Sequence, residues 1–160
     1  MARLPLQASA DLQQELRKIS IPLRLTKSSL LFEQGERPKG VNLVENGSVA
    51  LMLKLVRGRT VHERNAGTGS VLGLPATVND TAYSLTARAL CDVDLAFVAR
   101  ENLFETMNKN ISLTIEILRV LSQEVQAMRD VVRTRWQPGG LARKHPLASS
   151  SVWGRLRPGE

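Results

Sequence analysis

The first regular pattern of apolar and polar residues runs from Asp11 to Ile19. Leu12, Leu16 and Ile19 recur at intervals of four and three residues, which places them on one face of a helix. Asp11 stands at the start of this segment, as N-cap or first-turn acid, and Pro22 follows soon after its end. The pattern predicts a short amphipathic helix.

From Pro22 to about Phe97 the pattern changes to short apolar runs separated by turn-forming residues. The turn signals are Gln34-Gly35, Asn46-Gly47, Arg57-Gly58 and Gly67-Thr68-Gly69. We expect strands over residues 41–44, 48–56, 85–88 and 92–98. The first two should form a tight hairpin, because Asn-Gly favours the positive φ angles of such a turn. This rhythm predicts a compact all-β unit, a small barrel or jelly roll.

After the strands, residues 100–108 predict a short helix and residues 111–135 predict a long one without Gly or Pro. An apolar stripe with spacings of 3, 4, 3 and 4 follows the long helix: Leu118, Leu121, Val125, Met128 and Val132. Such spacing is typical of a coiled-coil seam.

A second apolar side of the long helix is formed by Ile111, Ile115 and Ile117, which we expect to pack on the strands. Because the helix has two apolar sides, we predict that the stripe pairs with another helix, most simply in a homodimer. Antiparallel or higher-order pairing, and packing of the stripe within the chain, stay open as alternatives.

The net charge of +7 is not spread evenly along the 160 residues. Residues 1–132 hold 16 Lys and Arg against 14 Asp and Glu, whereas residues 133–160 hold six against one. The body therefore lacks the clustered positive charge that a nucleic-acid backbone requires. We predict that residues 136–160 form a basic, disordered tail after a single domain over residues 1–135. A regulator that acts on nucleic acid through this tail is the alternative function.

The sequence shows no segment directed to a membrane or to secretion. No apolar run approaches the roughly 20 residues of a membrane helix, and the start lacks the apolar stretch of a secretory signal. Cys91 is the single cysteine and cannot form an intramolecular disulfide. We expect a cytoplasmic protein.

Four short motifs follow one another along residues 12–132. They are Leu31-Phe32-Glu33-Gln34-Gly35-Glu36, Asn46-Gly47-Ser48-Val49, Gly69-Ser70-Val71-Leu72-Gly73 and Arg100-Glu101-Asn102-Leu103-Phe104. In this order they resemble the motifs of the CRP/FNR-like cyclic-nucleotide-binding domains. The resemblance implies a mainly β fold with flanking helices: a double-stranded β-helix (a jelly-roll, cupin-like barrel) followed by a long C-terminal dimerisation helix. It also implies a sensor or effector domain in bacterial transcriptional signalling.

The resemblance places a ligand-binding cassette at Gly73. In members that bind cyclic nucleotides, a Glu follows this glycine and binds the ribose hydroxyl, and an Arg further along neutralises the phosphate. Leu74 and Tyr83 stand at those two positions here. A Tyr hydroxyl offers one neutral hydrogen bond where an Arg offers two charge-assisted ones. We therefore expect no high-affinity cyclic nucleotide and no other cofactor.

The degenerate pocket keeps some groups that could bind a small-molecule effector. Amides near Pro75 and Ala76 could attract an anion at the start of a helix, and Ser84 and Thr86 would supply hydroxyls. The candidate pocket residues are Gly73, Leu74, Pro75, Ala76, Tyr83, Ser84, Leu85 and Thr86. We expect this pocket to be filled by its own side chains or to hold an uncharged or weakly anionic molecule. Arg88 should face solvent.

Neither catalytic nor metal-binding motifs occur in the sequence. Cys91, His62 and His145 do not form a ligand set with the spacing of a metal site, so we predict no enzyme activity and no metal. The residues after the long helix lack the periodicity of a recognition helix, so we expect no winged helix-turn-helix and no sequence-specific DNA binding. The expected partner is a second copy or a full-length relative, and no membrane.

Overall fold

The computed structural model describes residues 7–135, without the side chains of His62, Glu63, Val131, Thr134 and Arg135. The chain divides into two compact units, Met1–Val125 and Gln126–Glu160. The predicted basic tail, together with His145, lies outside the described residues.

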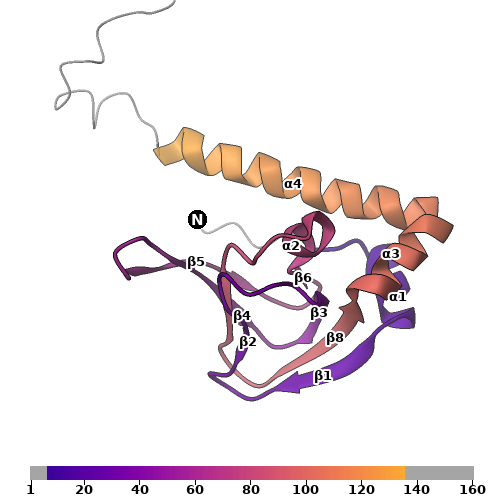
Figure 1. Cartoon of the computed structure of the whole chain (residues 1–160), viewed down its shortest axis with the longest axis horizontal. Coiled ribbons are helices and arrows are strands. Elements are labelled where there is room, and N and C mark those ends of the chain that lie inside the picture. The colour runs from indigo at the N-terminus through magenta and orange to yellow at the C-terminus, as the bar shows by residue number, and fades with distance from the viewer. Residues whose placement is uncertain (1–6, 136–160) are drawn as a thin grey trace, which may run out of the picture. The chain divides into compact units, whose positions relative to one another are not determined.

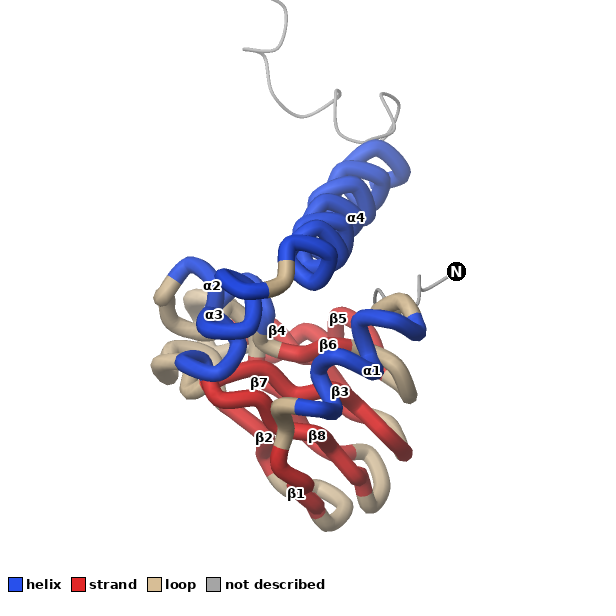
Figure 2. Tube along the Cα trace, turned by 90° about the vertical axis from the view of Figure 1, so that its right-hand side faces the viewer, coloured by secondary structure: helices blue, strands red, loops and turns tan. Residues whose placement is uncertain are grey.

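The strands of the described residues all lie in the first unit (Figures 1 and 2). In chain order the elements are α1 (Ala10–Lys18), β1 (Ile21–Leu25), β2 (Leu30–Phe32), β3 (Gly40–Asn46), β4 (Val49–Lys54), β5 (Thr60–Ala66), β6 (Val71–Leu72), α2 (Leu74–Asn79), β7 (Thr86–Ala89), β8 (Val93–Ala99), α3 (Arg100–Lys109) and α4 (Ile111–Arg135). No helix in this described part is long and apolar enough to cross a membrane.

The strands form two four-stranded sheets of the predicted jelly-roll type, in the orders β1-β8-β3-β6 and β2-β7-β4-β5. The strand pairs are antiparallel. Consecutive strands often lie in different sheets, as a jelly roll requires. The predicted fold class, mainly β with flanking helices, is confirmed.

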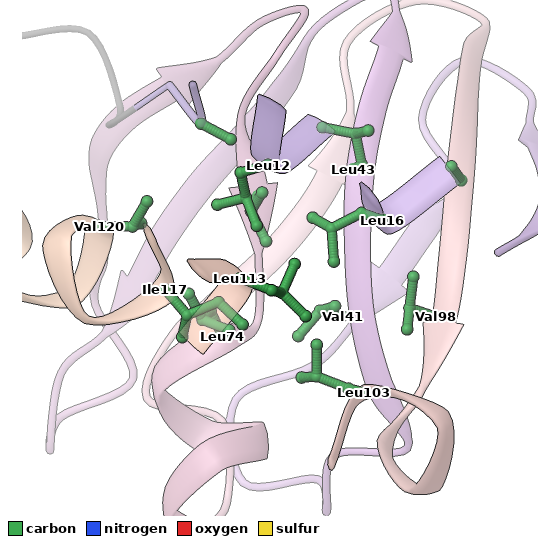
Figure 3. Close-up of a cluster of buried hydrophobic side chains, with 13 residues drawn as sticks. Leu12, Leu16, Val41, Leu43, Leu74, Val98, Leu103, Leu113, Ile117 and Val120 are labelled. Carbon is green, nitrogen blue, oxygen red and sulfur yellow. The ribbon is translucent and has the colours of Figure 1, made fainter. Parts of the chain in front are cut away.

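Alternation along β3 separates two cores. Val41 and Leu43 face the helices, whereas Asn42 and Val44 face the space between the sheets. The helix-side core, drawn in Figure 3, consists of Ala8, Leu12, Leu16, Val41, Leu43, Val71, Leu74, Ala96, Val98, Leu103, Leu113, Ile117 and Val120. The interior core consists of Phe32, Val44, Val49, Leu51, Ala66, Leu72, Ala76, Tyr83, Ala87, Ala89, Val93 and Leu95.

The predicted hairpin at Asn46-Gly47 is wrong. β3 pairs with β6 and β8, whereas β4 pairs with β5 and β7, so this turn carries the chain from one sheet to the other. Gly47 does adopt a positive φ of 99°, and a Cβ there would lie 2.7 Å from the carbonyl oxygen of Asp92. Asn-Gly signals this backbone conformation but does not determine which strands pair. The observed hairpin joins β4 to β5 at Arg57-Gly58, where the amide of Leu55 donates to the carbonyl of Arg59.

The helices begin and end close to the predicted residues. In α1, Ser9 is the N-cap, and its hydroxyl accepts a hydrogen bond from the amide of Leu12 (3.2 Å). Asp11 therefore acts as a first-turn acid, one of its two predicted roles. Asn110 caps α4 in the same way, with its side-chain oxygen accepting from the amide of Leu113 (3.1 Å).

The prediction for the inner side of α4 is right only for Ile117, which is 1% exposed. Ile111 and Ile115 are 75% and 43% exposed. Leu113 and Val120 are buried beside Ile117 instead, because residues four and three positions apart share a helix face. The packed side of α4 therefore follows the helical period and not the positions of the isoleucines.

Candidate functional site

The predicted cassette runs from the end of β6 through α2 to β7. Gly73 caps α2 with a φ of 81°, and Pro75 lies in the first turn, as predicted. The helix has only six residues, Pro75 has no amide hydrogen, and the amide of Thr77 donates to the carbonyl of Gly73 (3.0 Å). The start of α2 therefore lacks one of the amide donors that a helix usually offers to an anion, that of Pro75.

Tyr83 is packed into the interior core. The residue is 8% exposed, and its ring stacks on Phe32 with ring centroids 3.9 Å apart and an interplanar angle of 9°. Its hydroxyl donates to the carbonyl oxygen of Gly40 over 3.5 Å. Burial raises the pKa of this hydroxyl, which is therefore neutral at physiological pH. A neutral, stacked ring thus occupies the position that the resemblance assigns to the phosphate-binding arginine.

The turn after β2 supports the far end of the cassette. The amide of Gly35 donates to the carbonyl of Tyr83, and the amide of Tyr83 donates to the carbonyl of Glu36 (both 2.9 Å). The amide of Gln34 donates to the hydroxyl of Thr86 (3.0 Å). The Leu-Phe-x-x-Gly-Glu motif is therefore joined to the cassette by its backbone, and the Thr86 hydroxyl already has a partner.

The candidate pocket residues do not all face one space. Ala76 and Tyr83 belong to the interior core, and the partly buried Leu85 packs against it. Leu74 is 2% exposed but lies in the helix-side core, as Figure 3 shows. Pro75 and Ser84 are exposed.

Two residues to which the sequence analysis assigned no contact hold α2 in place. Thr77 is fully buried, and its hydroxyl donates to the carbonyl of Gly40 (2.9 Å). The Nε of Arg100 donates to the carbonyl of Thr77 (3.1 Å), one of the carbonyls that a helix end leaves without an internal partner. The guanidinium of Arg100 also lies 4.6 Å from the ring centre of Phe104. Arg100, from the fourth sequence motif, thus stabilises the fold through its contacts with Thr77 and Phe104.

Two other arginines lie on strands of the second sheet. Arg88 is exposed, as predicted, and donates to the carbonyl of Ser28 (3.0 Å). Arg64 is paired with Leu51, a residue of the interior core, and so lies on the interior-facing side of β5. Its Nη2 donates to Glu124 of α4 (3.2 Å). No strand was predicted from the sequence over residues 60–66, so Arg64 was not placed inside.

Three buried side-chain atoms in the described part of the chain lack a hydrogen-bond partner: Asn42 Oδ1, Arg64 Nε and Ser70 Oγ. Asn42 lies opposite Leu72 of the interior core, and Ser70 precedes Leu72 by two residues. By strand alternation both face the interior, as Arg64 does. The interior therefore contains polar groups as well as the stacked rings.

Most of the predicted stripe on α4 is exposed. The exposed fractions are 55% for Leu118, 50% for Val125, 63% for Met128 and 65% for Val132. Leu121 is partly buried and packs against the helix-side core. Ile111, at 75% exposure, precedes Leu118 by seven residues and extends the same heptad line toward the N-terminus of the helix.

An open groove of about 410 Å³ lies apart from the cassette, between α1 and the first turns of α4. Glu116 lines it and has a lowered pKa, because it accepts a hydrogen bond from the hydroxyl of Ser9 and pairs with Arg119. No group of three or more His, Cys, Asp or Glu within the described residues could hold a metal ion, and Cys91 is exposed.

Comparison with known proteins agrees with this geometry. The profile of the cyclic nucleotide-binding domain family matches residues 22–110, more than half of the chain. The chain belongs to this family. An uncharacterised protein of Haemophilus influenzae is 28% identical over 116 residues, which cover 71% of this chain and 90% of that protein. The anaerobic regulatory protein of Bacillus subtilis is 22% identical over 126 residues, which cover 78% of this chain and 53% of that regulator.

The fold of this family member matches that of solved CRP/FNR-type regulators. The crystal structure of Thermus thermophilus catabolite activator protein superposes with a TM-score of 0.71 at 16% identity, covering 79% of this chain and 59% of that one. At such identity the likeness shows the fold alone. The chain spans little more than half the length of these two regulators, and its resemblance to the CRP/FNR-like domains is confirmed.

Proposed function

We propose that this chain is a CRP/FNR-type effector domain in transcriptional signalling that does not use a cyclic nucleotide and that acts through pairing of α4. The observation that carries the proposal is the buried Tyr83, stacked on Phe32 at 3.9 Å. The resemblance assigns the position of Tyr83 to the arginine that would neutralise a phosphate. We infer a binding and regulatory role, and no catalysis.

The electrostatics of the cassette support this proposal. Burying a phosphate charge without a paired cation costs several kcal/mol. Arg88 faces solvent, and the Nε of Arg100 is bound to the carbonyl of Thr77. A cyclic nucleotide at the cassette would therefore meet a phenol hydroxyl and a six-residue helix in which Pro75 removes one amide donor.

Pairing of α4 with a second copy is the proposed output, with heterodimers of full-length relatives as a variant of the same contact. It is supported by the exposed aliphatic side chains on one side of a 25-residue helix. Exposed apolar stripes at heptad spacing are covered when two helices pair.

A small-molecule effector fits the proposal only if it is largely uncharged. The unpartnered Asn42 Oδ1 would accept a hydrogen bond from it, and the Ser70 hydroxyl could donate or accept one. Arg64 already pairs with Glu124, so a charged effector would add an uncompensated charge to the interior.

Titration calorimetry with cAMP and cGMP tests the proposed loss of nucleotide binding. We expect no heat of binding from the native chain below millimolar concentrations. Tyr83→Arg returns a cation to the cassette and should bind cAMP about tenfold more tightly than the native chain, since a charge-assisted hydrogen bond replaces a neutral one. Leu74 is left unchanged, because a Glu there would enter the helix-side core.

Tyr83→Phe is the matched control: it keeps the stacked ring, lacks the hydroxyl and should not bind either nucleotide. Circular dichroism verifies that each variant is folded. Micromolar binding of cAMP or cGMP by the native chain would show that the proposal is wrong, whatever the variants do.

A further inference from the structure

The ion pair between Arg64 and Glu124 joins the second sheet to α4. Arg64 lies on β5 opposite Leu51, on the side of the sheet that carries the interior core. Arginine is rarely found at such a position unless it is paired. Its side chain is 21% exposed, and its Nε is buried without a hydrogen-bond partner. Glu124 therefore compensates a guanidinium that is largely withdrawn from solvent.

Glu124 continues the buried side of α4. Leu113, Ile117 and Val120 pack in the helix-side core, and Glu124 follows Val120 by one helical turn. Its side chain is 24% exposed and lies 3.2 Å from Arg64 Nη2. The adjacent Val125 is 50% exposed and belongs to the stripe. Along α4, the contact with the strands and α1 thus changes from apolar packing to an ion pair at Glu124. The next residue, Val125, belongs to the stripe that is proposed to pair.

An ionic contact at this point differs from an apolar one. The hydrophobic interaction has no preferred direction, whereas a charge-assisted hydrogen bond fixes distance and direction. A fixed link at Glu124 determines which side of the helix faces away from the sheets, and so how Val125 is presented.

We propose that Arg64 is a positioning residue for α4: its pair with Glu124 holds the helix in the rotation that presents the stripe to a second copy. The part of this inference that concerns the second copy rests on the proposed function. The part that concerns the rotation and firmness of α4 does not.

The test uses the full chain and three variants: Arg64→Met, Glu124→Gln and the charge-swapped double variant Arg64→Glu/Glu124→Arg. Amide hydrogen exchange in α4 reports how firmly the helix is held, and sedimentation equilibrium reports pairing. Each single variant should speed exchange around residues 120–125 about tenfold and weaken pairing about tenfold. The charge-swapped variant should restore both the native rate of amide exchange and the native strength of pairing, which a role in packing alone would not do.

The matched control is the pair Glu105–Lys109 on α3, which is 2.6 Å long but 64% and 73% exposed. Glu105→Gln and Lys109→Met should change neither measurement, since exposed pairs contribute little. The positioning role is wrong if the single variants at Arg64 and Glu124 alter amide hydrogen exchange in α4 less than twofold. It is also wrong if the charge-swapped variant restores neither amide exchange nor pairing. If exchange responds as expected but the native chain is monomeric, the positioning role stands and the proposed pairing fails.

Discussion

Replacing Gly40 with alanine is expected to lower the free energy of unfolding by about 3 kcal/mol, at the upper end of what overpacking a core costs. A Cβ at this position would lie 2.0 Å from the carbonyl oxygen of Val98 and 2.9 Å from the ring of Phe97. Because β3 pairs with β8 here, the strain cannot be relieved by turning a side chain. The strands themselves must separate.

The same substitution should also disturb the cassette. The carbonyl of Gly40 accepts hydrogen bonds from the hydroxyls of Thr77 and Tyr83. Any shift of this peptide therefore weakens two of the contacts that hold α2 and the stacked ring. Urea unfolding followed by circular dichroism measures the loss of stability.

Gly67→Ala is the matched control, since a Cβ there would meet nothing within 4 Å and the residue has no positive φ. We expect a change below about 0.5 kcal/mol for this variant. Equal urea midpoints for Gly40→Ala and Gly67→Ala would mean that β3 and β8 leave room for a Cβ at residue 40.

The fold could be predicted because turn residues and helical periods are local signals. The long helix was predicted at its observed bounds, since its 25 residues contain enough turns for the 3.6-residue period to show. Strand pairing is not local. Asn46-Gly47 has the backbone of a tight turn, but its two flanking strands pair in different sheets. Which strands pair is determined by the arrangement of the whole jelly roll, and a two-residue turn signal does not specify that arrangement.

The cassette could be predicted in part. The resemblance pointed to Leu74 and Tyr83 as the departures from a nucleotide site, but it did not show that their side chains enter different cores. A helix of six residues is too short to display an amphipathic pattern. The contacts of Thr77 and Arg100 were not predicted, because their partners are backbone carbonyls distant in sequence.

Val125→Glu is expected to weaken pairing of the chain about 100-fold, if α4 pairs with a second copy as proposed. Val125 is 50% exposed, so the substitution removes apolar surface from the interface while leaving the body's cores intact. In a parallel pair, the two copies would also bring two carboxylates close together in an apolar layer. The dissociation constant from sedimentation equilibrium measures the effect, and circular dichroism should show an unchanged fold.

Gln123→Glu supplies the matched control, because it adds the same charge two residues earlier. Successive residues are about 100° apart around a helix, so residue 123 points about 200° away from residue 125. Gln123 is exposed, and its substitution should leave the dissociation constant within about twofold. Equal weakening by both variants would place the interface on another side of α4. If the native chain sediments as a monomer at every concentration, the stripe does not pair with a second copy. A full-length relative is then the partner expected to bind the stripe when it is added in the same experiment.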